Sequence, residues 1–117
     1  MPDFPHLMRA VIAEAIGEPQ RLVQVSTPRP RAGEVLVRVM ASALNPLDVK
    51  ILAGNAEHAR QPLPAILGID MAGIVEAVGA GTRGSREGEA VFGMAGGVGG
   101  HPGSLAGYSA YRVTSGW

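Results

Sequence analysis

Three side chains that can donate or accept hydrogen bonds lie within six residues of one another, at Asn45, Asp48 and Lys50. An amide or an ammonium group can donate to a carbonyl or a phosphate, and a carboxylate can accept. A fourth polar residue, Asp70, interrupts an apolar run, where a buried carboxylate needs a partner. These four residues are the candidates for a pocket that binds a cofactor or substrate, and no catalytic residue is assigned among them.

The elements on either side of Asn45 explain why these side chains should gather. Residues 34–42 alternate between two faces, which predicts a strand packed on one side, and the period then changes. Asn45 suits an N-cap, Pro46 suits the first helical position, and Gly54 supplies a stop. The sequence therefore predicts a strand that leads directly into a short helix, with a pocket at the junction.

Each candidate also has a structural alternative. N-capping alone explains Asn45, and Asp48 at the third helical position suits the positive end of the helix. Lys50 is most simply a solvated surface lysine. For Asp70 the favoured interpretation is a structural ion pair, with Arg38 as one candidate partner.

The composition indicates one soluble domain with a core of aliphatic side chains. The chain has 117 residues, of which 46% are hydrophobic but only 4% aromatic. Ten basic residues balance ten acidic ones, so we expect neither a nucleic-acid partner nor a membrane partner. Cysteine is absent, there is no leader-like N-terminus and no long apolar segment, and these features favour a cytoplasmic location.

Seventeen glycines and nine prolines imply many turns. Between these turns the sequence predicts strands at Arg9–Glu14, Leu22–Val25, Glu34–Ser42, Ile69–Val78, Ala90–Met94 and Ser109–Val113. Short strands at irregular spacing predict a barrel or sandwich rather than a doubly wound sheet. Residues 79–88 are expected to form a charged surface turn.

A glycine-rich stretch, Gly96 to Gly100, superficially resembles a phosphate-binding loop. A dinucleotide fingerprint requires glycines between a strand and a helix, with an acidic residue about twenty positions later. Here His101-Pro102-Gly103 follows instead, and no amphipathic helix is evident. We therefore interpret residues 93–103 as a loop at the side of the active site.

Four ordered blocks together resemble a known family: Asn45-Pro46-Leu47-Asp48, the run from Pro64 to Gly79, Gly88 to Gly93, and Gly103 to Tyr108. They are similar to the zinc-independent quinone oxidoreductases and enoyl reductases of the medium-chain dehydrogenase/reductase superfamily. The resemblance covers about residues 8–113. It implies a mainly β, GroES-like irregular β-barrel with a few short helices over residues 8–117, after an N-terminal extension at 1–7.

In this family the cofactor lies on a C-terminal Rossmann domain, and no such domain is evident in the sequence. The resemblance implies a substrate-side domain for NAD(P)H-dependent reduction of a quinone or an α,β-unsaturated carbonyl, with NADP(H) as cofactor. We expect the isolated chain to be inactive and to need a separate Rossmann domain as partner. The alternative is a non-catalytic GroES-like module for binding or oligomerisation.

The resemblance also bears on metals. Zinc-dependent relatives have a cysteine where this chain has Asn45, a histidine at Ile69 and an acid at Asp70, so only one ligand remains. A zinc site needs about three protein ligands. The three histidines, His6, His58 and His101, show no ligand spacing. We therefore expect a protein without zinc or any other metal.

Three positions depart from the family pattern. Lys50 replaces a tyrosine or a proton-relay histidine. Gly107 stands where relatives usually have Glu, which puts the hydrogen bonds around Tyr108 in question. The tail up to Trp117 is short, so apolar surface there could cause self-association.

Overall fold

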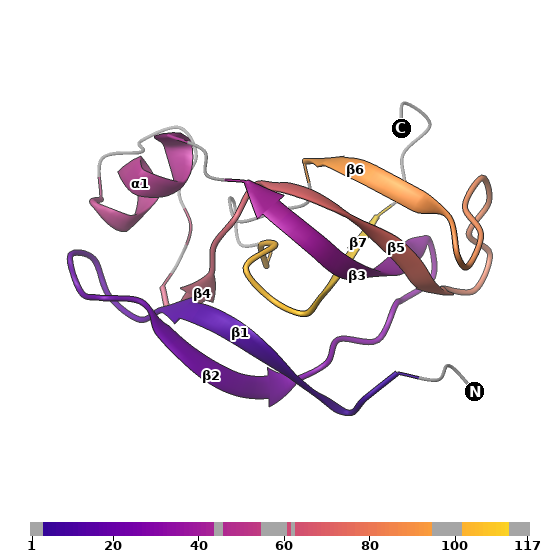
Figure 1. Cartoon of the computed structure of the whole chain (residues 1–117), viewed down its shortest axis with the longest axis horizontal. Helices are drawn as coiled ribbons and strands as arrows, with labels where there is room; N and C mark the ends of the chain where they lie inside the picture. Colours follow the sequence, from indigo (N-terminus) through magenta and orange to yellow (C-terminus); the bar gives the residue numbers. More distant parts are fainter. Residues whose placement is uncertain (1–3, 44–45, 55–60, 62, 95–101, 113–117) are drawn as a thin grey trace.

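The structure is a computed structural model that describes residues 4–43, 46–54, 61, 63–94 and 102–112. Its elements follow one another along the chain as β1 (Leu7–Ala13), β2 (Arg21–Ser26), β3 (Glu34–Ala43), α1 (Pro46–Leu52), β4 (Ala65–Ile66), β5 (Asp70–Val78), β6 (Ala90–Met94) and β7 (Tyr108–Arg112). Figure 1 shows the strands as two separate layers, with α1 beyond one end of them. The prediction of a mainly β fold with short helices is confirmed, with α1 as the helix within the described residues.

Two antiparallel sheets make up this fold. The first has the strand order β2-β1-β4 and the second β6-β5-β3-β7. In the second sheet β3 lies between β5 and β7, with Val35 opposite both Val78 and Tyr111. The strand that leads to the predicted pocket, β3, is thus an inner strand of the larger sheet (Figure 1).

All six predicted strands are present, with ends that differ by at most two residues. The strand that the sequence did not reveal is β4, which has only two residues and pairs with the end of β1 through Ile12 and Ile66. Two residues are too few to show an alternating pattern. The charged turn at 79–88 is also confirmed, since most of its residues are exposed.

The prediction that β3 packs on one side was wrong for its first half. Val35 and Val37 are buried on one face, but Leu36, which points to the other face, is also completely buried. Beyond Val37 the strand becomes exposed or half-buried. One half of β3 therefore lies inside the protein, and the other half extends to the surface where α1 begins.

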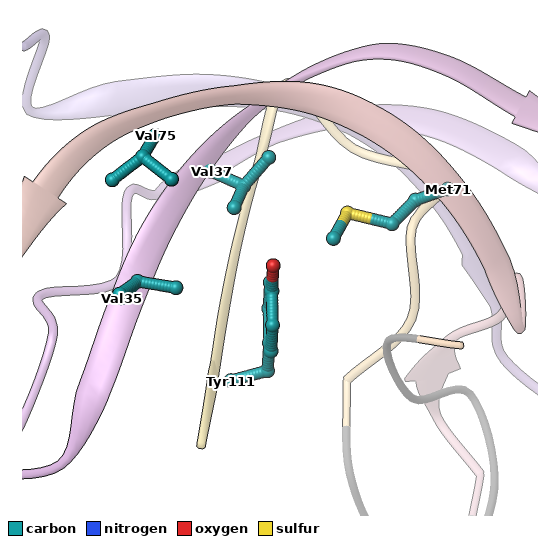
Figure 2. Close-up of a cluster of buried hydrophobic side chains, with 5 residues drawn as sticks. All are labelled: Val35, Val37, Met71, Val75 and Tyr111. Carbon is teal, nitrogen blue, oxygen red and sulfur yellow. The ribbon is translucent and has the colours of Figure 1, made fainter. Parts of the chain in front are cut away.

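One face of the larger sheet carries a cluster of apolar side chains. Figure 2 shows Val35 and Val37 from β3 and Met71 and Val75 from β5 around the ring of Tyr111 from β7. All five side chains are buried. This cluster buries apolar surface from three strands that are already paired by hydrogen bonds, and so stabilises this face of the sheet.

The segment between residues 103 and 107 joins the two sheets. On one side it bonds to β1, because Val11 N–H donates to the Leu105 carbonyl at 2.8 Å and Gly107 N–H donates to the Arg9 carbonyl at 2.9 Å. On the other side Val39 N–H donates to the Gly107 carbonyl at 2.9 Å. This segment therefore fixes the first sheet relative to the middle of β3.

Helix α1 begins at Pro46, as predicted, and ends before Gly54, whose φ of 79° is left-handed. Its apolar face carries Leu47 and Ile51, which pack in a second cluster with Ala13 and Leu67. No helix in the described part of the chain is long and apolar enough to cross a membrane.

Candidate functional site

The four sequence-predicted site residues fall into three environments. Asp48 lies in the first turn of α1 and is buried, at 9% exposed. Lys50, in the last turn of the same short helix, is exposed. Asp70 is half-buried at the first position of β5, and Asn45 lies outside the described residues.

The fold brings Asp70 to the same end of the sheet as the start of α1. Asp70 lies opposite Ala43, the last residue of β3, and α1 begins three positions later at Pro46. Both carboxylates, those of Asp48 and Asp70, belong to residues that have interaction partners in the fold. The described members of the set therefore lie on elements that meet near the end of β3, and their role in a pocket stays a prediction.

Two serines that the sequence analysis did not single out hold this junction together. Ser104 Oγ donates to the Asp70 carbonyl at 2.8 Å, and the hydroxyls of Ser42 and Ser104 are 2.7 Å apart. Ser42 Oγ also lies 3.3 Å from the Asp70 carbonyl. Since each hydroxyl carries one proton, Ser104 can donate to the carbonyl while accepting from Ser42. We call Ser42, Asp70 and Ser104 the serine junction.

Ser104 is the buried and closely packed member of the serine junction, while Ser42 and Asp70 are half-buried. Ser104 is only 1% exposed. Its backbone N–H donates to the Gly68 carbonyl at 2.9 Å, so the Gly68 turn and the 103–107 segment are bonded through both backbone and side chain. At Gly68, where φ is 110°, an added Cβ would lie 2.6 Å from Ser104 Oγ. Only glycine allows the two backbones to approach this closely without a shift.

One feature of the sequence could have pointed to Ser42 and Ser104. Both lie beside segments that had already been selected, Ser42 three residues before Asn45 and Ser104 within the Gly103–Tyr108 block. A serine in such a position commonly bonds to backbone groups. Which backbone carbonyl each one reaches depends on β3–β5 register and on the path of the 103–107 segment, and neither can be derived from spacing.

The proposed Arg38–Asp70 ion pair is wrong. Arg38 Nε instead lies 3.5 Å from Glu76 Oε2, and Arg38 stands opposite Ile74 in the β3–β5 register. Asp70 pairs with Ala43, five positions further along β3. A strand rises about 3.3 Å per residue, so that offset exceeds the length of an arginine side chain.

The two tyrosines of β7 differ in environment. Tyr108 packs tilted against Phe4, with ring centroids 6.1 Å apart. Burial and the nearby Glu76 carboxylate raise the pKa of the Tyr108 phenol, while Arg38 opposes the shift. Burial, together with Glu89, raises the pKa of Tyr111 well above its ordinary value. Both phenols therefore remain protonated at neutral pH and can donate hydrogen bonds.

Gly107, where relatives usually have Glu, still forms hydrogen bonds through its backbone. The N–H and carbonyl of Gly107 are both used, toward Arg9 and Val39. An added Cβ at Gly107 would meet Met8 Cβ at 3.6 Å, an ordinary contact. The segment therefore bridges the two sheets through its main chain, and space remains for a side chain at this position.

The described residues hold no group of three or more histidine, cysteine, aspartate or glutamate side chains suited to a metal ion. At the position of the relatives' histidine, Ile69 is an apolar side chain that is only 1% exposed. His6 is exposed, while His58, His101 and the Gly96–Gly100 loop lie outside the described residues. What the described part offers chemically is hydrogen bonding from Lys50, the serines and the backbone.

Comparison with known proteins identifies the sequence family. Residues 31–115 match the family described as the alcohol dehydrogenase GroES-like domain. The chain is 38% identical over 90 residues to a quinone oxidoreductase from Lama guanicoe, covering 74% of this chain and 27% of that protein. It is 37% identical over 68 residues to the NADPH-dependent alkenal/one oxidoreductase, chloroplastic, from Arabidopsis thaliana, covering 58% of this chain and 18% of that protein.

The solved structures agree with this match. An alcohol dehydrogenase superfamily protein from Novosphingobium aromaticivorans is 50% identical, with a TM-score of 0.87 over 90% of this chain and 32% of the other chain. The present chain thus spans about a quarter or less of the length of the two curated relatives and about a third of that solved structure.

Proposed function

The chain belongs to the alcohol dehydrogenase GroES-like domain family of the medium-chain dehydrogenase/reductase superfamily, and we propose that it forms the substrate-side domain of a zinc-independent, NADP(H)-dependent oxidoreductase. Its substrate is a quinone or an α,β-unsaturated carbonyl compound. The reaction is a hydride transfer to that substrate, for which the bound nicotinamide supplies the hydride.

The observation that carries this proposal is the 74% of the chain that aligns with a quinone oxidoreductase at 38% identity. The second relative, an alkenal/one oxidoreductase, acts on a related class of electron-poor carbonyl compound by its name. Quinones and enones share a carbonyl group conjugated to a carbon–carbon double bond. A single pocket wall that donates hydrogen bonds to a carbonyl oxygen would therefore bind both classes of substrate.

The proposed wall of the pocket is the end of the larger sheet together with α1. Lys50 is the described candidate whose exposed side chain can donate a hydrogen bond to a substrate carbonyl. Asp48 and Asp70 would position the helix and the start of β5, and Asn45 would contact cofactor or substrate through its amide. The serine junction keeps the start of β5 fixed beneath this wall.

Zinc independence is supported by the side chains at the positions where zinc-dependent relatives carry ligands. Asn45 and Ile69 cannot replace a thiolate and an imidazole, and the Ile69 side chain is buried in the core. Carbonyl activation would then depend on hydrogen-bond donors and on positioning rather than on a Lewis acid.

The described residues do not fit a whole dinucleotide. A pyrophosphate requires a glycine-rich turn whose backbone N–H groups converge at a helix start. Helix α1 begins at Pro46 and has seven residues, and no glycine-rich turn precedes it among the described residues. We therefore propose that the cofactor is held by a separate Rossmann domain, and we derive no step from it on this chain.

A domain replacement tests the proposal. This chain would replace the GroES-like domain of a quinone oxidoreductase that retains its own cofactor domain, and NADPH oxidation would be followed with 1,4-benzoquinone and with an enone. We expect quinone- or enone-dependent turnover. A chimera that folds and binds NADPH but reduces neither substrate class would favour a non-catalytic module.

Variants of the chimera test the role of Lys50. Replacing Lys50 by Met keeps the aliphatic part of the side chain and removes the donor, so kcat/KM should fall by about tenfold if a charged hydrogen bond to the carbonyl is lost. Arg83→Met, in the exposed 79–88 turn, is the matched control and should leave kcat/KM unchanged.

A further inference from the structure

A cavity of about 770 Å³ lies between the first sheet and the free edge of β7. Its lining includes Met8 from β1, Ile66 from β4 and Tyr111 from β7. Pockets for small organic ligands have volumes of about 300–1,000 Å³, and this cavity falls within that range, with a lining that is both polar and apolar. None of the four candidate pocket residues discussed above lines this cavity.

One side of the cavity carries positive charge. The segment that follows β2 contributes Arg29 and Arg31, both exposed, and Glu34 is the acidic residue in the described lining. The Glu34 carboxylate already accepts a hydrogen bond from the Arg31 backbone N–H at 2.9 Å. Within the described part of the chain neither guanidinium makes an ion pair. Two arginines are therefore available to an anion at this rim.

A buried polar group lines the same cavity. Ser109 is 2% exposed and lies on the lining. Its hydroxyl has no hydrogen-bond partner among the described residues. A buried hydroxyl without a partner is costly, so such a group usually marks a site that is completed by something else. Ser109 can both donate and accept, which suits a polar substituent on a ligand.

We propose that this cavity binds a small amphipathic organic anion. Its carboxylate or sulfonate would bind at the rim to Arg29 and Arg31, its apolar body would pack on Met8, Ile66 and Tyr111, and the Ser109 hydroxyl would meet a polar group on that body. Met94, Pro102 and Gly103 of the 93–103 loop also line this cavity, but the binding proposed here does not rest on the proposed redox function.

Both the charge and the lining of the cavity favour an amphipathic organic anion over other ligands. A neutral apolar molecule would use the floor of the cavity but leave both guanidinium groups unused. An inorganic anion would bind the arginines but leave the apolar lining in contact with water and the Ser109 hydroxyl without a partner. An organic anion with one charged end uses all three features, and its affinity should fall as salt screens the exposed arginines.

Calorimetric titration of the purified chain with 2-naphthoate and with 2-naphthamide tests the inference. The two probes share one aromatic body and differ in charge. We expect naphthoate to bind about tenfold more tightly than naphthamide at low salt. This advantage should shrink in high salt, because the cations at the rim are exposed to solvent.

Matched variants locate the binding site. The double substitution of Arg29 and Arg31 by Gln should remove the advantage of naphthoate. The control variant, Arg83→Gln with Arg86→Gln, makes the same change in charge in the exposed 79–88 turn. This variant should keep the tighter binding of naphthoate. Ser109→Ala removes the hydroxyl with little change in volume and should weaken 6-hydroxy-2-naphthoate, which has a polar group on its aromatic body, while leaving the affinity for 2-naphthoate unchanged.

Three outcomes would overturn the proposal: no binding of either probe, equal binding of both at low salt, or a naphthoate advantage that the Arg29/Arg31 variant retains. Circular dichroism of every variant would confirm that the fold is kept. Since both arginines are exposed, their replacement should not unfold the chain.

Discussion

At the scale of single residues, the serine junction explains why the end of the larger sheet is well defined. Two hydroxyls converge on the carbonyl of Asp70, and one of them, from Ser104, is almost completely buried. A buried carbonyl that loses such a donor keeps its desolvation cost. The start of β5 therefore depends on a residue that lies 34 positions away in the sequence.

Replacing Ser104 by Ala should destabilise the chain by about 1–2 kcal/mol, because the Asp70 carbonyl and the Ser42 hydroxyl each lose a partner. Urea unfolding followed by circular dichroism measures this. Ser26→Ala is the matched control on the exposed last position of β2 and should change the free energy of unfolding by less than about 0.5 kcal/mol. Equal effects at the two positions would contradict the role given to the junction.

The buried phenol of Tyr111 predicts a loss of stability at alkaline pH. Its pKa in the folded chain is raised above the ordinary value of 10.0, so above about pH 10 the unfolded chain releases a proton that the folded chain retains. The free energy of unfolding therefore falls as pH rises beyond the ordinary pKa. Tyr111→Phe should make this fall shallower between pH 9 and about 11.5.

The control for this measurement is Tyr108→Phe, which removes a half-buried phenol from the same strand. We expect a smaller change of slope there, since Tyr108 is less buried and Arg38 opposes the upward shift of its pKa. An unchanged alkaline slope in Tyr111→Phe would show that the phenol is not the group responsible.

Residue-scale chemistry was only partly predictable. Both ends of the helix were predictable. Pro46 at the first helical position and Gly54 after the last one follow from local backbone chemistry. The partner of Arg38 was not predictable, because it depends on register: β3–β5 pairing places Asp70 opposite Ala43, far along the strand, while Glu76 lies at a bulge beside Arg38. Ser42 and Ser104 were missed for the same reason.

At the scale of elements, β3 is the strand on which the rest of the fold depends. It pairs with β5 on one side and β7 on the other, and its first half is buried on both faces. The segment at 103–107 bonds to its middle through Val39. A strand that alternates in sequence can still be buried on both faces when other segments cover it, and alternation alone does not reveal that.

Leu36→Ala tests this burial. Leu36 is completely buried on the face opposite Val35 and Val37, so its truncation should cost about 2–5 kcal/mol. Chemical unfolding gives the value. Leu22→Ala on β2, where the side chain is 65% exposed, is the control and should have a small effect. A cost below about 1 kcal/mol at Leu36 would mean that this face is open to solvent.

At the scale of the whole molecule, the two sheets leave an exposed apolar edge at β6. Phe92 is 78% exposed and Met94 is 73% exposed, and β6 is an outer strand of the larger sheet (Figure 1). The strand Ala90–Met94 carries neither a charged side chain nor a proline. Natural edge strands commonly use such residues to prevent pairing with a second chain.

We expect the isolated chain to self-associate through this edge. Sedimentation velocity should show a rise in apparent mass with concentration, and Phe92→Ser should shift the chain toward monomer. Leu7→Ser, at a side chain that is 53% exposed on β1, is a matched control and should not. A strictly monomeric wild-type chain at high concentration would contradict this expectation.

The whole-molecule architecture was the part most open to prediction. Glycine and proline marked the turns, and ordered blocks such as Gly103–Tyr108 carried the family resemblance that the GroES-like match confirms. The cavity at β7 could not be foreseen, because it forms between Met8, Arg29 and Ser109, residues whose proximity exists only once both sheets are placed.

The central claim is that this chain supplies the substrate side of a reductase and leaves cofactor binding to another domain. Its most direct test is a titration with NADPH, following nicotinamide fluorescence and quinone reduction in parallel, for the isolated chain and for the chimera with a relative's cofactor domain. We expect neither binding nor turnover from the chain alone and both from the chimera. Quinone reduction by the 117-residue chain alone would contradict the claim, because it would require a complete cofactor site within these residues.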